Sequence, residues 1–255
     1  METIGHKQQD GVALIQLNRG IINAINQQVL DELGEALKVF KDDPMVHGLV
    51  LTSSNDKFFS IGFDLPELYP LPQQEFGVFY QAFNHLCLDL YTFPKPTIAA
   101  ITGHATAGGC ILALCTDYRF MAEGRTVMGL NESKLEVPIT YLADCLLNQL
   151  VGEDQARQIV SSGELYPPED ALEMGMVDQL YSSEEVISAT ARKIRDLGMH
   201  SLDAFGADKR LRVHPIESQV RSNLEKEIKL FLERWYAPEA RQLLGNALSK
   251  FTPKD

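Results

Sequence analysis

The chain has 255 residues, of which 45% are hydrophobic and 23% charged, as is typical of a soluble globular protein and not of a disordered or collagen-like chain. Its 23 basic and 35 acidic side chains give a net charge of −12, which argues against nucleic acid as the main partner. The apolar stretches are much shorter than the ~18 residues of a membrane-spanning helix, so we expect no insertion into a membrane.

The first half of the chain alternates predicted strands and helices, which favours an α/β core. Continuous apolar runs predict strands at residues 12–17, 47–52, 97–101 and 116–122. Apolar residues at helical spacing predict helices at residues 26–41, 75–92 and 110–114, with a proline-punctuated loop at 66–72.

From residue 141 onward the apolar spacing is helical throughout. It predicts helices at residues 142–150, 153–162, 168–174, 184–197 and 220–235. No flexible linker separates the two halves, so we expect a single fold with a closely packed helical extension.

The ends of the sequence bear on the location of the protein, and its Cys and His residues bear on metal binding. The start, METIGHKQQDG, lacks a basic segment followed by an apolar run, and the last four residues match no organelle address, so we expect a cytoplasmic protein. The four cysteines and six histidines show no spacing typical of metal ligands, and we expect no metal site.

Two segments share a feature that can carry chemistry. In FFSIGFDL (residues 58–65) and in TIAAITGHATAGGC (residues 97–110), an apolar segment meets glycine near the predicted start of a helix. Backbone N–H groups at a helix N-terminus have no partner within the helix and bind anions. Two converging turns could place two N–H groups on one oxygen and stabilise an enolate. Alternatively, these glycines serve only turns and close packing.

Five segments, in order and spacing over residues 10 to 182, resemble the crotonase or enoyl-CoA hydratase/isomerase superfamily, and especially its Δ3,Δ2-enoyl-CoA isomerases. They are LNR…NAIN (17–26), FFSIGFDL (58–65), PKPTIAAITGHATAGGCILALCTDYRF (94–120), GLNESKLEVP (129–138) and VGEDQARQIVSSGELYPPEDALEMGMVDQL (151–180).

This resemblance implies an α/β fold with a ββα spiral core over residues 1–190 and an α-helical trimerisation region over residues 191–255. It also implies an acyl-CoA thioester substrate and a homotrimer or dimer of trimers. No separate cofactor is expected, because coenzyme A is part of the substrate.

The resemblance also implies roles for individual residues. The backbone N–H groups of Phe63 and Gly108 would form an oxyanion hole for the thioester carbonyl. Glu132 would be the base that moves a proton from C2 to C4 of a 3-enoyl-CoA. Family hydratases carry a second glutamate where this chain has Ile111, and isoleucine cannot transfer protons. We therefore expect an isomerase.

The sequence also permits functions other than isomerisation. Glu136 stands where the family usually has glycine; it is either a surface charge or a second pocket carboxylate, which would favour a hydratase or thioester hydrolase. A non-catalytic acyl-CoA-binding protein is a third possibility. We expect Asp64 and Asp117 to cap or brace turns, and His104 to serve as an ordering hydrogen-bond partner.

The phosphates of coenzyme A require local cations in such an acidic chain. Lys57, next to the FFSIGFDL block, is the first candidate and Arg19 the second. The family pattern further implies that substrate or coenzyme contacts come from a set of residues that includes Ala24, Ile61, Gly62, Gly109 and Ile111. Lys250 and Phe251 resemble residues that a neighbouring subunit offers to the coenzyme.

Overall fold

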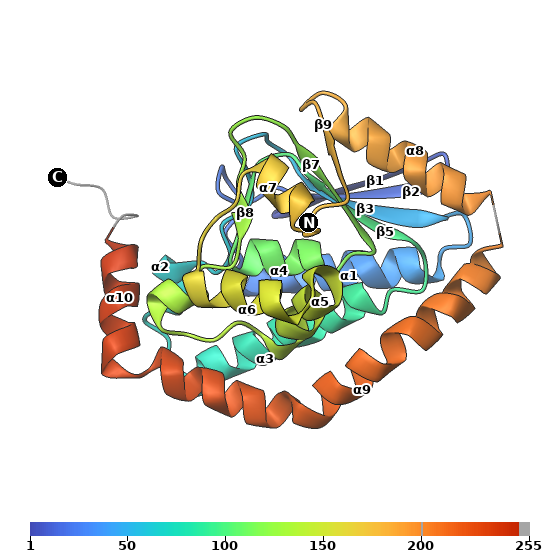
Figure 1. Ribbon diagram of the computed structural model, residues 1–255. Coiled ribbons are helices and arrows are strands. Elements are labelled where there is room, and N and C mark those ends of the chain that lie inside the picture. Colours follow the sequence, from blue (N-terminus) through green and yellow to red (C-terminus); the bar gives the residue numbers. More distant parts are fainter. Residues whose placement is uncertain (200, 250–255) are drawn as a thin grey trace.

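Two sheets form the centre of the molecule (Figure 1). The computed structural model describes residues 1–199 and 201–249. The larger sheet has the order β1-β2-β3-β5-β7-β9, with β1 antiparallel to β2 and all other neighbours parallel. Its strands are β1 (Ile4–Gln9), β2 (Val12–Leu17), β3 (Gly48–Ser53), β5 (Thr97–Ile101), β7 (Tyr118–Ala122) and β9 (Gln179–Tyr181). The smaller, parallel sheet consists of β4 (Phe58–Ser60), β6 (His104–Thr106) and β8 (Met128–Gly129).

The two sheets are connected in a repeating way, because a strand of the smaller sheet follows three of the strands of the larger one. The chain passes from β3 to β4, from β5 to β6 and from β7 to β8, and β6 is followed directly by α4 (Gly108–Leu114). This is the spiral of ββα units that the family resemblance implies, and the α/β fold is confirmed.

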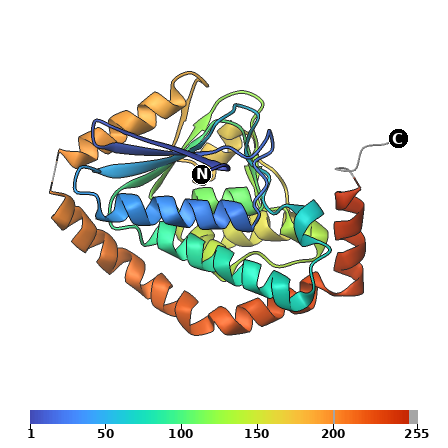
Figure 2. The same cartoon turned by 180° about the vertical axis from the view of Figure 1, so that it is seen from behind.

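Side chains alternate between the two faces of the larger sheet, because successive residues of a strand point in opposite directions. On one face Leu14, Val50, Ile98 and similar residues pack against α8 (Val186–Gly198). On the other face Ile15, Leu51, Ile101 and their neighbours join the main hydrophobic core beneath the sheet. Figures 1 and 2 show α8 on one side and the remaining large helices on the other.

The helices beneath the sheet form two layers. The inner layer contains α1 (Gln27–Asp42), α3 (Gln73–Tyr91), α4, α5 (Tyr141–Val151) and α6 (Glu153–Ser162). The long helix α9 (Leu202–Trp235) runs below them, and α10 (Pro238–Leu248) turns upward beside α2 (Leu65–Leu68). The shorter helices are the 3-10 helix η1 (Glu132–Leu135) and α7 (Pro168–Glu173).

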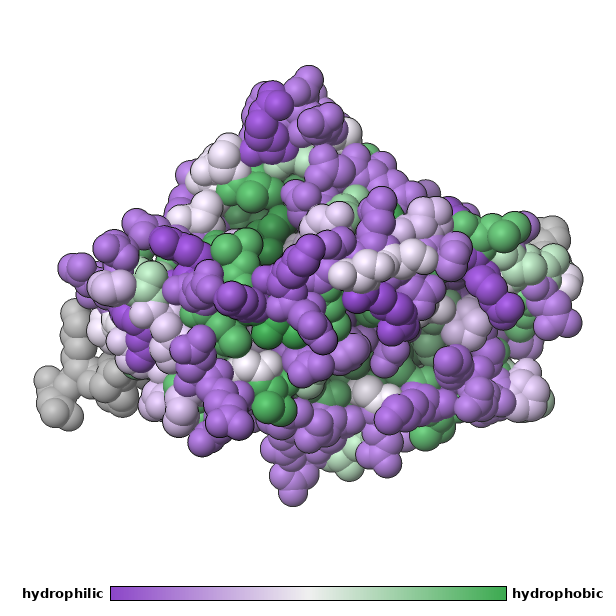
Figure 3. Space-filling model, turned by 90° about the horizontal axis from the view of Figure 1, so that it is seen from below, coloured by the Kyte–Doolittle hydropathy of each residue, from purple (hydrophilic) through white to green (hydrophobic). Residues whose placement is uncertain are grey.

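The face formed by α9 is seen from below in Figure 3. Hydrophilic side chains cover most of it, and apolar side chains gather in patches between them. None of the helices in residues 1–199 and 201–249 combines the length and the apolar character needed to cross a membrane.

Several elements differ from the expectation. The strand β1 and the helix α10 were not predicted, and α9 begins at Leu202 instead of residue 220. Within the predicted loop at 66–72, the turn α2 reaches Leu68. The expected division at residue 190 falls inside α8, which packs against β3 and β5 of the larger sheet. The helical C-terminal region is confirmed, but it continues a helix that belongs to the core.

Candidate active site

A cavity of about 630 Å³ lies where the turns of the spiral meet η1, α9 and α10. Its lining contains five of the predicted site residues. These are Ile61, Phe63, Gly108, Ile111 and Glu132. The residues that sequence analysis assigned to the chemistry therefore come together around one space.

The first turn of this cavity contains the N–H group of Phe63, which has no acceptor in the described part of the chain. Ile25 N donates to the carbonyl oxygen of Gly62 at 2.8 Å, and Asp64 N donates to the carbonyl oxygen of Ile25 at 2.9 Å. In this parallel bridge the amide of Phe63 points away from Ile25. No acceptor among residues 1–199 and 201–249 receives that N–H group.

The second turn presents the N–H group of Gly108, which is the first residue of α4 and so has no acceptor within the helix. The two turns touch, because a Cβ placed on Gly62 would lie 2.8 Å from the backbone N of Gly108. Gly62 also has a φ of +91°, which favours glycine. Phe63 and Gly108 therefore lie in two turns that touch, and both residues line the cavity.

Close packing holds the second turn in place. Ala107 has a φ of +49°, unusual for a residue with a side chain, and its N–H donates to the carbonyl oxygen of Gly129 at 3.0 Å. A Cβ on Gly109 would lie 2.2 Å from the carbonyl oxygen of Ser60. Gly109 is buried behind the turn and does not line the cavity, so its visible role is to permit this approach.

Glu132, the first residue of η1, is only 8% exposed and lines the same cavity. Its Oε2 atom has no hydrogen-bond partner among the described residues. Burial raises the pKa of this carboxyl to about 7, although the backbone N–H groups of Glu132 and Asn131 act in the opposite direction. A carboxylate with a pKa near neutrality is suited to general acid–base chemistry at physiological pH.

Glu136 does not share this environment. It follows η1 with a φ of +55°, is exposed, and its Oε2 lies 3.3 Å from Nη2 of Arg234 on α9. It does not line the cavity. The surface interpretation of Glu136 therefore fits the structure, and the interpretation as a second pocket carboxylate does not. Among the described residues, Glu132 is the one carboxylate in the cavity wall.

The two candidate cations for coenzyme phosphates differ. Arg19 is engaged by the carboxylates of Asp64 and Glu67, and its Nη1 also donates to the carbonyl oxygen of Ala24 at 3.2 Å. Its charge is neutralised, so the structure does not support Arg19 as a phosphate ligand. Lys57 is exposed and makes no ion pair within residues 1–199 and 201–249, but it lies outside the cavity lining.

Other predicted residues lie beside the cavity or serve the scaffold. Ala24 and Gly62 are buried next to the first turn without lining the cavity. Asp64 caps α2 by accepting from Glu67 N at 3.1 Å, as expected. His104 accepts from Val127 N at 3.1 Å through Nδ1, an ordering role. Lys250 and Phe251 lie outside the described residues.

Much of the apolar wall of the cavity was not predicted from the sequence. Tyr80 of α3 and Phe231 of α9 stack with ring centroids 3.8 Å apart, and Trp235 stacks on Phe76 at 4.3 Å. Tyr80, Phe231 and Trp235 line the cavity, as does Leu244 of α10. The one local signal for this wall is the spacing of Phe231 and Trp235, which puts both rings on one face of a helix.

Comparisons with known proteins add to this geometry. A family model described as enoyl-CoA hydratase/isomerase matches residues 7–249. Mouse mitochondrial enoyl-CoA delta isomerase 1 is 33% identical over 179 residues, which are 70% of this chain and 62% of the mouse protein. The human protein of that name is 32% identical over 185 residues, which are 72% of this chain and 61% of the human protein. The matched part thus spans about three fifths of these relatives.

Solved structures resemble the whole of the chain. The human mitochondrial delta3-delta2-enoyl-CoA isomerase superposes with a TM-score of 0.94 and 26% identity, covering 98% of each chain. An enoyl-CoA hydratase/isomerase from Xanthobacter autotrophicus Py2 gives a TM-score of 0.85 and 26% identity, covering 99% of each chain.

Proposed function

The chain belongs to the enoyl-CoA hydratase/isomerase family, and from that membership and the cavity we propose that it isomerises 3-enoyl-CoA to 2-enoyl-CoA. The observation that carries this proposal is that, among the described residues, Glu132 is the one carboxylate of a cavity wall that also contains Phe63 and Gly108, whose backbone N–H groups have no acceptor in residues 1–199 and 201–249. A 1,3-proton shift needs one group that accepts a proton and returns it. It needs no activated water.

The proposed reaction begins with ionised Glu132, which removes a proton from C2 of the acyl chain. The negative charge moves to the thioester oxygen, where the N–H groups of Phe63 and Gly108 bind it. The protonated carboxyl of Glu132 then gives the proton to C4, and the double bond comes into conjugation with the thioester. One backbone donor in such a hole is typically worth 10²–10³ in rate.

Ile111, which lines the same cavity, disfavours hydration as the reaction of this protein. Adding water to a double bond requires a group that positions and activates the water in addition to a proton donor. Ile111 lines the wall where the family pattern implies a second glutamate in hydratases, and Glu136 is held by Arg234 outside the cavity. This is the feature that supports isomerisation over hydration or thioester hydrolysis.

The proposal extends to the coenzyme and the assembly. Lys57 would meet a phosphate of coenzyme A, with Ala24 and Ile61 near its adenine and pantetheine parts. The aromatic wall of Tyr80, Phe231 and Trp235 would contact the acyl chain. A homotrimer or a dimer of trimers would form through the helical C-terminal region.

The test is turnover of 3-hexenoyl-CoA by the purified protein, followed by the absorbance of the conjugated thioester that forms. We expect the wild-type protein to convert this substrate and the Glu132→Gln variant to lose about 10²–10⁴-fold in kcat, the usual contribution of general acid–base catalysis. Glu136→Gln is the matched control, because it makes the same change outside the cavity; its rate should equal that of the wild type.

Three results would overturn the proposal. The first is the absence of turnover at high enzyme concentration while acyl-CoA still binds, which would indicate a binding protein. The second is water addition to crotonyl-CoA at a rate comparable with isomerisation. The third is loss of activity in Glu136→Gln together with its retention in Glu132→Gln.

A further inference from the structure

A second cavity, of about 310 Å³, lies at the C-terminal end of α4, whereas the first cavity lies at the N-terminal end of this helix. The two cavities share no lining residue. The end of α3, the loop between α4 and β7, α5 and α9 form its walls. Its apolar lining comes from Leu114, Leu146, Leu150 and Phe205. Its volume lies at the lower end of the 300–1,000 Å³ typical of ligand sites, so it suits a small molecule.

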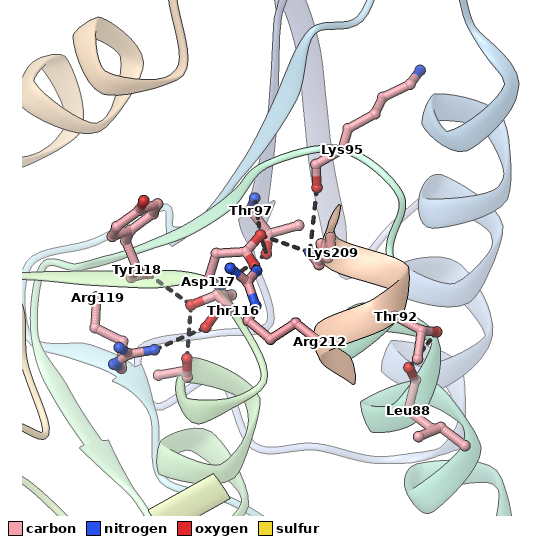
Figure 4. A network of polar contacts seen from close by, with 11 residues as sticks. Leu88, Thr92, Lys95, Thr97, Thr116, Asp117, Tyr118, Arg119, Lys209 and Arg212 are labelled. Carbon is pink, nitrogen blue, oxygen red and sulfur yellow. Dashed lines mark hydrogen bonds and ion pairs between the residues drawn. The ribbon is translucent and has the colours of Figure 1, made fainter. Parts of the chain in front are cut away.

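The carboxylate of Asp117 lines this cavity, and Figure 4 shows the polar contacts that surround it. Asp117 accepts hydrogen bonds from both N and Oγ1 of Thr97 and from Nζ of Lys209, all through Oδ2, at 2.9, 3.0 and 2.6 Å. Its Oδ1 accepts from Nη2 of Arg212 at 2.9 Å. Two cations therefore surround one carboxylate. Because the nearby Arg119 is balanced by Asp178, one positive charge remains in excess.

Tyr91 and Arg212, both in the cavity wall, have donor groups that make no hydrogen bond to the described residues, and the side chain of Arg212 is 54% exposed. The hydroxyl of Tyr91 is buried in a side chain that is 9% exposed, and no hydrogen bond joins it to any described residue. Burial raises the pKa of this phenol to about 12, although the charge of Arg212 opposes the shift. Within residues 1–199 and 201–249, Arg212 makes its one hydrogen bond through Nη2, which leaves Nε and Nη1 available.

A buried hydroxyl without a partner costs free energy, and its presence in a folded protein calls for a water molecule or a ligand. Arginine binds carboxylates through two parallel N–H donors, and a tyrosine hydroxyl can add a third. From the excess charge, the hydroxyl of Tyr91, the remaining N–H groups of Arg212 and the apolar walls, we infer that this cavity binds a small monocarboxylate with a short apolar chain. The carboxylate would lie between Arg212 and Tyr91, and the chain against Leu146 and Phe205.

The test is isothermal titration calorimetry of the full-length protein with hexanoate, with hexan-1-ol as a neutral probe of the same length. We expect saturable binding of hexanoate, weakened about tenfold in Arg212→Gln and in Tyr91→Phe, since each change removes a hydrogen bond to a charged group. Tyr91→Phe keeps the ring and its packing. Arg210→Gln is the matched control, because it removes the same charge from an exposed position on α9; its affinity should remain that of the wild type.

This inference is independent of the proposed function, because no residue of the first cavity takes part in it. Absence of saturable binding at millimolar hexanoate would overturn it and would mean that water or a second copy of the chain fills the cavity. Equal affinity in the wild type, Arg212→Gln and Tyr91→Phe would also overturn it and would place hexanoate elsewhere, as would equal binding of hexan-1-ol.

Discussion

At the scale of single residues, Glu132 combines a functional group with a cost to stability. Its carboxyl is buried, and Oε2 lacks a partner among the described residues. A buried carboxylate is destabilised relative to water unless it is paired, and this destabilisation is what raises its pKa toward neutrality. The same feature that makes Glu132 a suitable base therefore lowers the free energy of unfolding when it is ionised.

This relation predicts a dependence of stability on pH. The pKa of Glu132 rises from 4.5 in an unfolded chain to about 7 in the folded protein. The folded state thus binds the proton more tightly, and this contribution to stability is lost as the pH rises from 4.5 through 7. We expect Glu132→Gln to be more stable than the wild type at pH 8, by up to about 3 kcal/mol.

The measurement is urea unfolding of both proteins at pH 5 and pH 8. The difference between them should be small at pH 5 and large at pH 8. An equal difference at the two pH values would show that the carboxyl of Glu132 titrates normally in the folded state.

At the scale of elements, the turn that begins α4 depends on the close approach of two backbones. Gly109 allows the carbonyl of Ser60 to lie where a side chain would otherwise stand. This contact sets the distance between β4 and α4, and with it the position of the Gly108 N–H group relative to that of Phe63. The geometry of the proposed oxyanion hole is thus a property of how two segments pack.

We therefore expect Gly109→Ala to lower kcat by about 10²-fold, because shifting one oxyanion donor has a cost of that order, and to destabilise the fold. Gly34→Ala in α1 is the matched control: its Cβ would meet one atom, at 3.8 Å, and alanine in a helix should stabilise by about 0.5–1 kcal/mol. Steady-state kinetics and thermal unfolding of both variants test this. An active Gly109→Ala variant would contradict the packing argument.

The elements also show what local sequence can predict. The strand β5 was predictable because Thr97–Ile101 is a continuous apolar run between prolines and small residues. The strand β1 was not, because only Ile4 of its six residues is buried. The first half of α9 contains Pro215 and few buried side chains, so its pattern is weak, and tertiary contacts such as that of Lys209 with Asp117 hold it instead.

The residues of the candidate site likewise fall into those that local sequence predicts and those that it does not. Glu132, Phe63 and Gly108 stand in short motifs that resemble those of the family, so sequence was enough to propose them, and in the structure all three line one cavity. The wall residues Tyr80 and Phe231 are 151 positions apart in the chain and meet only after folding. Arg19 is neutralised in part by Asp64, which lies 45 positions away in the chain. No local sequence pattern predicts this ion pair.

At the scale of the whole molecule, the net charge of −12 sets conditions for an anionic substrate. The general field would repel the phosphates of the proposed coenzyme A thioester, so individual cations near the cavity would have to compensate. Arg19 is already paired with two carboxylates, which leaves Lys57 as the first residue to examine. Because Lys57 is exposed, an ion pair between it and a phosphate would contribute modestly to binding and would be screened by salt.

We expect Lys57→Gln to raise KM for 3-hexenoyl-CoA by up to about fivefold at low salt with little change in kcat, because an exposed ion pair contributes at most about 1 kcal/mol. The effect should shrink at high salt. Lys41→Gln, an exposed cation at the end of α1, is the control and should leave KM unchanged. Equal KM values for all three proteins at low salt would remove Lys57 from the coenzyme site.

The most direct test of a single-base proton shift is the fate of deuterium placed at C2 of 3-hexenoyl-CoA, followed by mass spectrometry and NMR of the product. Glu132 is nearly enclosed, so it should return part of the deuterium that it removes before exchange with water, and the 2-enoyl product should carry label at C4. A product with no deuterium at C4, formed with the label lost entirely to solvent, would contradict a mechanism in which Glu132 alone carries the proton.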